Sequence, residues 1–394
     1  MSVAPPRRLI VAIAFAAFVS LGLPDGVLGV AWPSIRRTFG LPVDRLGSIL
    51  LAVMTGYLAS SFGSGAIVAR RGVGSLLAWS NALVALSCAG YALAPAWPMM
   101  LVGGLVAGLG AGAIDAGINV YAAERFSPRL VSWLHASWGA GASLGPIIMT
   151  VVLGAGLAWR WGYAVVAGIL AAMALSFFAT MGLWGSPRTI PGDAPAPRAA
   201  STFSRTLLRP AVWAHMAVFF LYTGIEASAG QWAYSLLTEA RRIPPRAAGF
   251  WVGGYWASLT VGRLVSGAAA QRFTPSALLR AAMASALFAA TLVWADRGPA
   301  PTLAGLALLG FSLAPIYPML IASTPARLGA EHATHAIGFQ VSAACLGAAA
   351  VPGAAGSIAR WQGIEAIPTL LVGSVAALLL LHEGMNARRR ARSD

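Results

Sequence analysis

Long apolar segments alternate with short polar ones along the chain. A helix that spans a membrane needs about 20 consecutive, mostly apolar residues. Twelve stretches of this kind stand out, at about 9–32, 46–68, 74–94, 98–122, 131–154, 162–184, 210–237, 247–270, 276–295, 301–322, 335–358 and 366–382. The pattern therefore predicts an all-α membrane protein with 12 transmembrane helices.

The connection between the sixth and seventh stretches is longer than the others. Residues 185–209 are rich in proline, alanine and arginine, which is typical of a flexible linker. We therefore expect an N-terminal six-helix bundle over residues 1–184 and a cytoplasmic linker over residues 185–209. A C-terminal six-helix bundle with a basic cytoplasmic tail is expected over residues 210–394.

The two halves carry a repeat. Gly65 and Arg70 follow the second apolar stretch, and Gly267 and Arg272 follow the eighth, 202 positions later (267 − 65). At the same offset, Gly108 matches Gly310, and the pair Leu144-Gly145 matches Leu346-Gly347. Two six-helix halves related by a parallel repeat are typical of one large class of secondary transporters.

Composition supports a membrane protein and excludes other classes. Of the 394 residues, 58% are hydrophobic and 10% are charged, whereas a soluble domain has about 25% charged residues. The formal net charge of +15 is carried by arginines in short clusters between apolar stretches, which argues against a nucleic-acid surface. Eighteen of the 27 basic residues fall on the side that holds both termini. The positive-inside rule therefore predicts cytoplasmic termini, in a multi-pass protein of a bacterial inner membrane.

Motifs of other chemistries are missing from the sequence. The two cysteines, Cys88 and Cys345, lie in apolar stretches, where small buried thiols are expected rather than a disulfide framework. No group of histidines and cysteines has metal-ligand spacing. No phosphate-binding loop or nucleophile elbow is present either. We expect neither an enzyme nor an ATP-driven pump, with no metal and no cofactor.

Three acidic residues lie inside apolar stretches: Asp25, Asp115 and Glu226. A charge at the centre of a bilayer costs about 2.5–3.5 kcal/mol on insertion scales, so such residues mark functional sites by default. They occupy the first helices of successive three-helix units, and the fourth such helix carries Tyr317 between two prolines. Asp25 and Glu226 lie 201 positions apart (226 − 25). This arrangement predicts one central cavity lined by four equivalent helices.

Helical spacing places polar partners beside two of these acids. Asp115 and Asn119 are one turn apart and share a helix face. Tyr222 and Glu226 have the same spacing, and Gln231 lies further round their helix. Asp115 is either a ligand or proton site or a strut between helices. Glu226 is either a proton or ligand group or a fixed partner to an arginine or a histidine.

The surroundings of Asp25 allow two interpretations. Pro24 removes a helix hydrogen bond, and glycines at 22, 26 and 29 flank the acid. An opened helix would offer its carbonyl groups to a ligand or cation, whereas small residues can simply permit tight helix packing.

The fifth and eighth stretches contribute aromatic and titratable residues. His135 is a candidate for a proton relay, a gate hydrogen bond or a structural role. Trp138 has a flat face suited to the C–H side of a sugar ring, although packing alone explains it equally well. The same alternatives hold for Trp251, Tyr255 and Trp256, which share one face of their helix.

These features together resemble the major facilitator superfamily over the whole chain. The loop motif of that family is Gly-x-x-x-Asp-Arg-x-Gly. Gly65 and Arg70 fit it with Ala69 at the aspartate position, and Gly267 and Arg272 fit it with Gln271 there. The resemblance implies a role in conformational gating for loop arginines, and we assign it to a set of four: Arg70, Arg71, Arg263 and Arg272.

Two further motifs resemble particular branches. Asp115, Gly117 and Asn119, followed by the Leu-His-x-x-Trp-Gly pattern that runs from Leu134 to Pro146, look like the fucose–galactose–glucose:proton symporters. That resemblance implies that Asp25 and Asp115 serve proton coupling and sugar recognition. The stretch from Gly141 to Pro146 is also similar, in part, to a motif of drug:proton antiporters.

The sequence thus predicts a secondary transporter with the major facilitator fold, acting as a monomer on a small polar solute of the sugar type. The expected mechanism is alternating access with proton symport. Proton coupling is assigned to Asp25, Glu226 and His135. Substrate binding is assigned to a larger set: Asp115, Asn119, Trp138, Tyr222, Gln231, Trp256 and Tyr317. The alternatives are a proton-driven efflux antiporter for drugs or amphiphilic metabolites, and a transporter-like receptor without flux.

Overall fold

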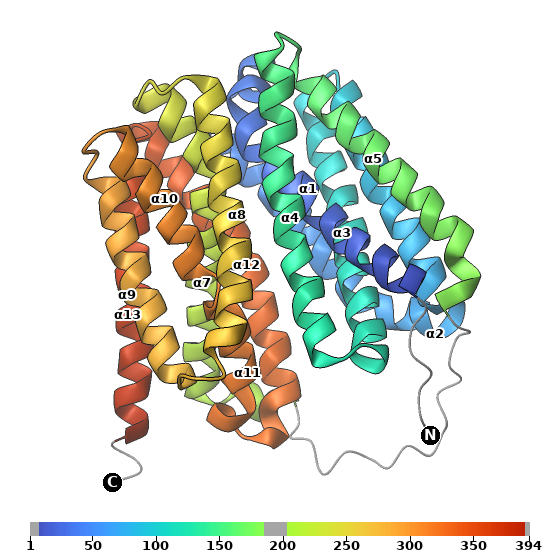
Figure 1. Cartoon of the computed structure of the whole chain (residues 1–394), viewed down its shortest axis with the longest axis vertical. Helices are drawn as coiled ribbons and strands as arrows, with labels where there is room; N and C mark the ends of the chain where they lie inside the picture. Colours follow the sequence, from blue (N-terminus) through green and yellow to red (C-terminus); the bar gives the residue numbers. More distant parts are fainter. Residues whose placement is uncertain (1–7, 185–202, 391–394) are drawn as a thin grey trace.

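The computed structural model describes residues 8–184 and 203–390, which form helices joined by short turns (Figure 1). The first half contains α1 (Arg8–Thr38), α2 (Leu46–Leu93), α3 (Trp97–Arg125), α4 (Pro128–Gly154) and α5 (Trp159–Thr180). The second half contains α6 (Phe203–Leu207), α7 (Pro210–Ser235), α8 (Pro245–Ala269), α9 (Pro275–Trp294), α10 (Pro299–Leu313), α11 (Ile316–Leu328), α12 (Ala330–Gln362) and α13 (Ala366–Arg390). Three short helical turns complete the set: η1 (Val43–Arg45), η2 (Met181–Trp184) and the π-turn η3 (Leu236–Ala240).

The described helices account for the twelve expected spans. Nine segments of the described chain are long and apolar enough to cross a membrane, and the one at Val43–Leu93 has 51 residues, enough for two crossings. The two crossings in α2 meet at Gly72, whose φ of 78° lies in the left-handed region that favours glycine. Conversely, α10 and α11 form one broken span, interrupted at Ala314 and Pro315. With α7 and α8, these segments give the predicted twelve.

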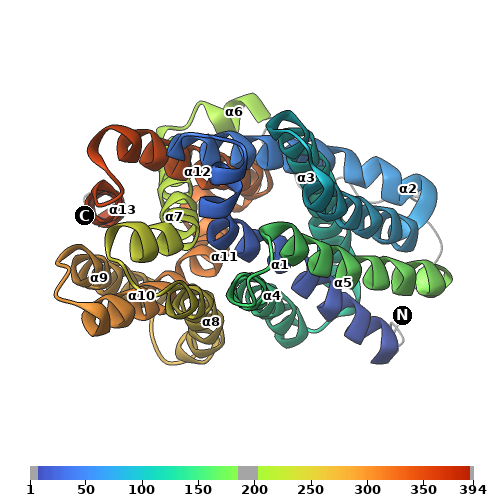
Figure 2. The same ribbon diagram turned by 90° about the horizontal axis from the view of Figure 1, so that it is seen from above.

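The spans form two groups. Figure 1 shows α1–α5 on one side and α7–α13 on the other. The first turn of α1 and the last turn of α13 lie toward the same end of the molecule, here called the termini end. Seen from above, the same two groups lie side by side (Figure 2). Residues 185–202 of the expected linker lie outside the described part of the chain. Its remaining residues include the short helix α6, followed by Arg209, which donates from Nη1 to the carbonyl oxygen of Leu328 at 2.7 Å.

Small residues allow the helices within each group to approach closely. A Cβ atom added to Gly26 of α1 would lie 2.2 Å from the carbonyl oxygen of Ala142 in α4, and one added to Gly22 would lie 2.0 Å from that of Trp138. Because α1 remains helical through Pro24, these glycines serve tight packing and not an opened helix. The structure thus decides between the two interpretations of this segment.

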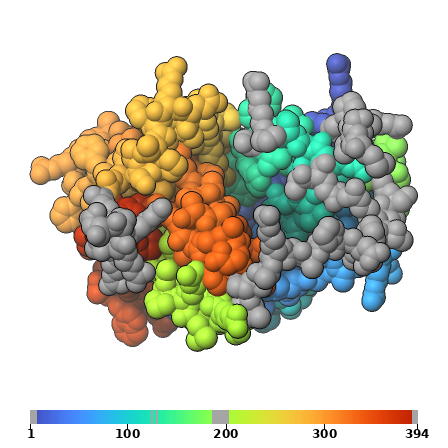
Figure 3. Space-filling view, turned by 90° about the horizontal axis from the view of Figure 1, so that it is seen from below, coloured from blue at the N-terminus to red at the C-terminus, as the bar shows by residue number. Residues whose placement is uncertain are grey.

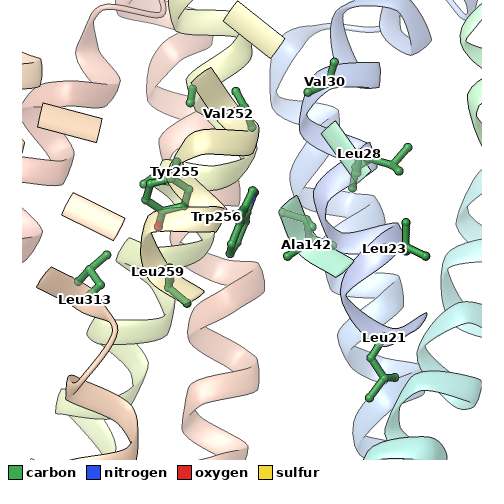
Figure 4. Packing of buried hydrophobic residues seen from close by; sticks show 14 of the residues in the cluster. Leu21, Leu23, Leu28, Val30, Ala142, Val252, Tyr255, Trp256, Leu259 and Leu313 are labelled. Atoms are coloured by element: carbon green, nitrogen blue, oxygen red, sulfur yellow. The ribbon is translucent and has the colours of Figure 1, made fainter. Parts of the chain in front are cut away.

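The two groups also pack against each other through α1, α4, α7 and α8. Figure 4 shows Val252, Trp256 and Leu259 of α8 on one side of this contact, and Ala142 with residues of α1 on the other. All of these labelled residues are buried. The apolar contact brings the polar residues of the same helices to the middle of the molecule.

Contacts at the two ends of the molecule differ. At the end opposite the termini, Arg36 forms an ion pair with Glu239, and Arg360 Nη1 lies 3.2 Å from Asp44 Oδ2. Gly47 and Gly353 also touch there, since a Cβ on Gly47 would lie 2.6 Å from the Cα of Gly353. Figure 3, seen from the termini end, shows the two halves meeting along a recessed line. The structure is therefore closed at the end opposite the termini.

Candidate functional site

The first polar cluster surrounds Asp115 of α3. Asn119, one turn along, donates from Nδ2 to Asp115 Oδ1 at 3.0 Å, and the Tyr57 hydroxyl of α2 donates to Oδ2 at 2.6 Å. The helices are close enough for this contact because Gly112 lies against the backbone of Tyr57, where a Cβ would be 2.2 Å from the carbonyl oxygen. Both carboxylate oxygens therefore have a neutral donor and keep lone pairs for donors on a ligand.

The second cluster surrounds Glu226 of α7. The Tyr222 hydroxyl donates to Glu226 Oε2, and Arg263 Nη2 of α8 lies 3.7 Å from the same oxygen. The Tyr255 hydroxyl donates to the main-chain oxygen of Glu226 at 2.9 Å, which fixes α8 against α7. The side chains of Arg263 and Glu226 are 20% and 12% exposed, so this acid has a cationic partner in a largely buried place.

The third acid, Asp25 of α1, has a different environment. Its side chain is half-buried, and the Trp138 indole is placed to donate to its carboxyl group. Gln231 of α7 donates from Nε2 to the main-chain oxygen of Asp25 at 3.0 Å. The ion pairs formed by residues 8–184 and 203–390 do not include Asp25.

Aromatic side chains connect the halves between these acids. Trp138 of α4 packs edge-to-face with Trp256 of α8, with ring centroids 5.6 Å apart. The guanidinium carbon of Arg263 lies 5.0 Å from the centroid of the Trp138 ring, within the range of a cation–π contact. Trp138 therefore contacts Asp25 in the N-terminal half. It also contacts Arg263 and Trp256 in the C-terminal half.

Most of the substrate and coupling residues assigned from the sequence lie near these clusters. Tyr317 of α11 packs against Phe219 and Tyr222, at 5.3 and 6.1 Å between centroids. His135 is exposed and meets the ring of Phe18 edge-on at 5.0 Å. Gln231 is 6% exposed and is occupied by the Asp25 backbone, so in this state it joins α1 to α7.

The four arginines assigned to gating separate into two kinds. Arg70 and Arg71 are exposed near the Gly72 break, beside Ala66 and Ile67, and Arg272 is exposed in the turn after α8. Arg263 instead lies among the central polar residues, with Glu226 and Trp138. Its place in the structure thus differs from that of the loop arginines with which the sequence had grouped it.

Sequence reasoning missed one member of the site, Tyr57. A tyrosine in an apolar stretch gives no charge signal, and it meets Asp115 only because α2 and α3 pack together. The polar run of Ser60, Ser61 and Ser64 that follows it was the available indication of a polar face on this helix.

Comparisons with known proteins find one family model and two curated relatives. The family model described as Major Facilitator Superfamily matches residues 12–352. The 3-(3-hydroxy-phenyl)propionate transporter of Escherichia coli (strain K12) is 26% identical, over 95% of this chain and 94% of its own. Bypass of stop codon protein 6 of Saccharomyces cerevisiae is 24% identical over 68% of this chain, which spans 58% of that longer relative.

Solved structures show the same fold. The nucleoside transporter NupG superposes with a TM-score of 0.76 at 12% identity, covering 96% of this chain and 100% of its own. The fucose:proton symporter FucP of E. coli gives a TM-score of 0.63 at 17% identity, covering 96% of this chain and 98% of its own. At these identities the likeness concerns the fold alone.

Proposed function

Because the chain belongs to the major facilitator superfamily, and is therefore a multi-pass membrane transporter and not an enzyme, we propose that it carries a small polar solute of the sugar type by proton symport. The observation that carries this proposal is the Asp115 cluster. A carboxylate held by Tyr57 and Asn119 presents further acceptor sites to the hydroxyl groups of a ligand. Trp138, which packs against the buried Trp256, supplies aromatic surface for the apolar side of a ring.

Roles follow from the environments of the residues. Asp115 and Asn119 hold the solute, together with Tyr57, and Tyr222, Tyr317, Trp138 and Trp256 line the space around it. Asp25 is the primary proton carrier, with Glu226 and His135 as further candidates for coupling. Arg70, Arg71 and Arg272 act at the termini end, where the two halves separate and approach. The protein works as a monomer.

The orientation in the membrane is part of the proposal. Arginine placement puts both termini in the cytoplasm of a bacterial inner membrane. With that orientation, closure at the Arg36–Glu239 end makes the present state inward-facing. The halves 1–184 and 210–394 then rock about the central site, as in alternating access.

Ligand binding is tested by thermal unfolding of the detergent-solubilised protein with hexoses, nucleosides and a hydroxyphenylpropionate. The proteins compared above are named for fucose, for nucleosides and for 3-(3-hydroxy-phenyl)propionate. A ligand at 100 times its Kd stabilises the state that it binds by about 2.7 kcal/mol. We expect hexoses to raise the Tm of the unmodified protein and to have no effect on Asp115→Ala. Stabilisation by the arylpropionate alone would reject the sugar class.

Coupling is tested in proteoliposomes with radiolabelled D-glucose and L-fucose. We expect an imposed pH gradient to drive accumulation in the unmodified protein and no accumulation in Asp25→Asn. Solute movement opposite to the proton flux would indicate the efflux antiporter instead. Binding without either uptake or counterflow would indicate a receptor.

A further inference from the structure

Arg263 is a cation that lies beside Glu226 and Trp138 at the centre of the molecule. It comes from α8, its Nη2 is 3.7 Å from Glu226 Oε2, and its guanidinium lies over the Trp138 ring of the other half. A planar guanidinium can direct an N–H edge at a carboxylate and its face at an aromatic ring simultaneously, which an ammonium group cannot do. The simultaneous contact with both groups therefore depends on the planar shape of arginine, whereas the effect on Glu226 depends on its charge.

The two pseudo-equivalent acids, Asp25 and Glu226, differ in what faces them. Glu226 meets charged or titratable groups on several elements: Tyr222 on its own helix, Arg263 and Tyr255 on α8, Asp25 on α1 and Tyr317 on α11. Among the described residues, Arg263 is the cation within ion-pair distance of Glu226. Asp25 faces Trp138 and Glu226, and the described ion pairs leave its carboxylate out.

This difference bears on which acid can carry a proton. A carboxylate beside a cation is stabilised in its ionised form, and removing one partner of a largely buried pair leaves an uncompensated charge. A proton carrier has to gain and lose its proton in every cycle. Glu226 is therefore poorly suited to this task as long as Arg263 stays beside it, whereas Asp25 has no such restraint.

We propose that Arg263 is a positioning residue that holds Glu226 as a permanently ionised counter-ion, so that Asp25 alone carries the transported proton. This inference rests on the proposed proton symport and assigns its coupling group. In this proposal Glu226 is no longer a proton-coupling residue, and Arg263 is no longer a gating residue. The contact with Trp138 also ties the ion pair to the half of the molecule that holds Asp25.

A stability cycle tests the counter-ion part without any substrate. The variants are Glu226→Gln, Arg263→Gln and the double variant, with Arg246→Gln, an exposed arginine of the same helix, as the matched control. We expect each single variant to lower the Tm by about 3 °C or more and the double variant to recover at least half of that loss, because it leaves no unpaired charge. Arg246→Gln should leave the Tm unchanged. Strictly additive losses in the double variant would overturn the counter-ion role.

Transport assays test the coupling part in the same variants. In proteoliposomes, the double variant should still accumulate labelled D-glucose or L-fucose under a pH gradient, within about threefold of the unmodified protein, because the mutated pair only supports the site. Asp25→Asn should retain counterflow exchange and lose accumulation. A double variant that exchanges solute but no longer accumulates it would show that Glu226 carries the proton and would overturn the proposal.

The pH dependence of exchange distinguishes the proposed role from a purely structural one. If Arg263 had only a structural role, its replacement would leave this pH dependence unchanged. In Arg263→Gln, Glu226 loses its cation, and the loss of an opposite charge disfavours the ionised form of a carboxyl group. We therefore expect a second ionisation in the pH profile of exchange. Arg263→Lys keeps the charge and should show a single ionisation, as should the double variant. An unchanged profile in Arg263→Gln would contradict the proposal. If the unmodified protein accumulates neither sugar, the proposed function fails, and the stability cycle still decides whether Arg263 and Glu226 form a coupled pair.

Discussion

In the N-terminal half, Gly108 of α3 lies against the carbonyl oxygen of Val53 in α2. In the C-terminal half, Gly310 of α10 lies against that of Tyr255 in α8. Both residues of the second contact follow those of the first by 202 positions (310 − 108 and 255 − 53). An added Cβ would approach the oxygen to 1.9 Å in one half and 2.4 Å in the other. The helix contact has thus been kept in both copies of the repeat.

The polar residues have not been kept in the same way. At the same offset, Asp115 corresponds to Tyr317, Tyr57 to Leu259, and Arg263 to Ser61. The first half therefore holds an acid with neutral donors, and the second half holds an acid with a cation. A glycine that packs against a backbone oxygen cannot be replaced by a larger residue. A residue that faces the space between the halves can be replaced in one half without a matching change in the other. The comparison teaches that the scaffold is symmetric and the chemistry is not.

The largest effect is expected from Asp115, whose carboxylate accepts hydrogen bonds from two neutral donors. Asp115→Asn removes the charge but keeps most of the shape. Hydrogen bonds to a charged group contribute about 1.5–3 kcal/mol, so the affinity for the solute should fall roughly 10- to 150-fold. The KM of uptake and the ligand-induced Tm shift measure this loss. The matched change in the other half, the double variant at Glu226 and Arg263, should leave the affinity largely intact. Equal losses in the two variants would remove the distinction between the clusters.

The symmetric scaffold predicts equal effects of glycine substitutions in the two halves. Gly108→Ala and Gly310→Ala should each destabilise the protein by about 1–3 kcal/mol, as overpacking does. Gly168→Ala in α5 is the control, since nothing lies within 4 Å of its added Cβ. Thermal unfolding in detergent measures all three. Destabilisation by only one of the two packed glycines would show that the halves have diverged in packing as well.

The fold was accessible from the sequence because the bilayer sets the length of its helices. All twelve predicted stretches overlap helices of the structure, and the family match confirms the fold. The details depend on local geometry that hydropathy does not carry. The break between α10 and α11 lies inside one predicted stretch, 301–322, and the helix Phe203–Leu207 is too short to show a periodic pattern.

The candidate site was accessible only in part, and the reason is physical. A charge in an apolar stretch is conspicuous, so the three acids were found, and the bond between Asp115 and Asn119 follows from their spacing on one helix. Partners on other helices depend on packing, which is why Tyr57 was missed and Arg263 was grouped with loop arginines. The functional roles of all these residues remain predictions.

A smaller effect is expected from the two tyrosines that donate to the acids. Tyr57→Phe removes one of two donors to Asp115, and an ordinary hydrogen bond contributes about 0.5–1.5 kcal/mol, so the KM should rise roughly two- to tenfold. Tyr222→Phe should change the KM less, because Arg263 still faces the same oxygen of Glu226. Uptake kinetics of the two variants, side by side, measure the difference. A larger effect of Tyr222→Phe would place the solute at the second cluster.

The smallest effect is expected at the closed end. Two ion pairs join the halves there, and each pair has one residue from either half. The side chains of Arg36 and Glu239 are each 26% exposed, and exposed pairs contribute about 0–1 kcal/mol. Neutralising this pair should therefore shift the balance between the closed and open states of this end by no more than about fivefold.

Spin labels on cysteines that replace Arg45 and Arg246, with Cys88 and Cys345 replaced by serine, report the separation of the halves at this end. Double electron–electron resonance should show a larger long-distance population in the variant with Arg36→Gln and Glu239→Gln. High salt should produce the same change in the unmodified protein, because exposed charges are screened. A distance distribution that responds to neither change would mean that the apolar and glycine contacts alone close this end, and the asymmetry between the halves would then be confined to the central site.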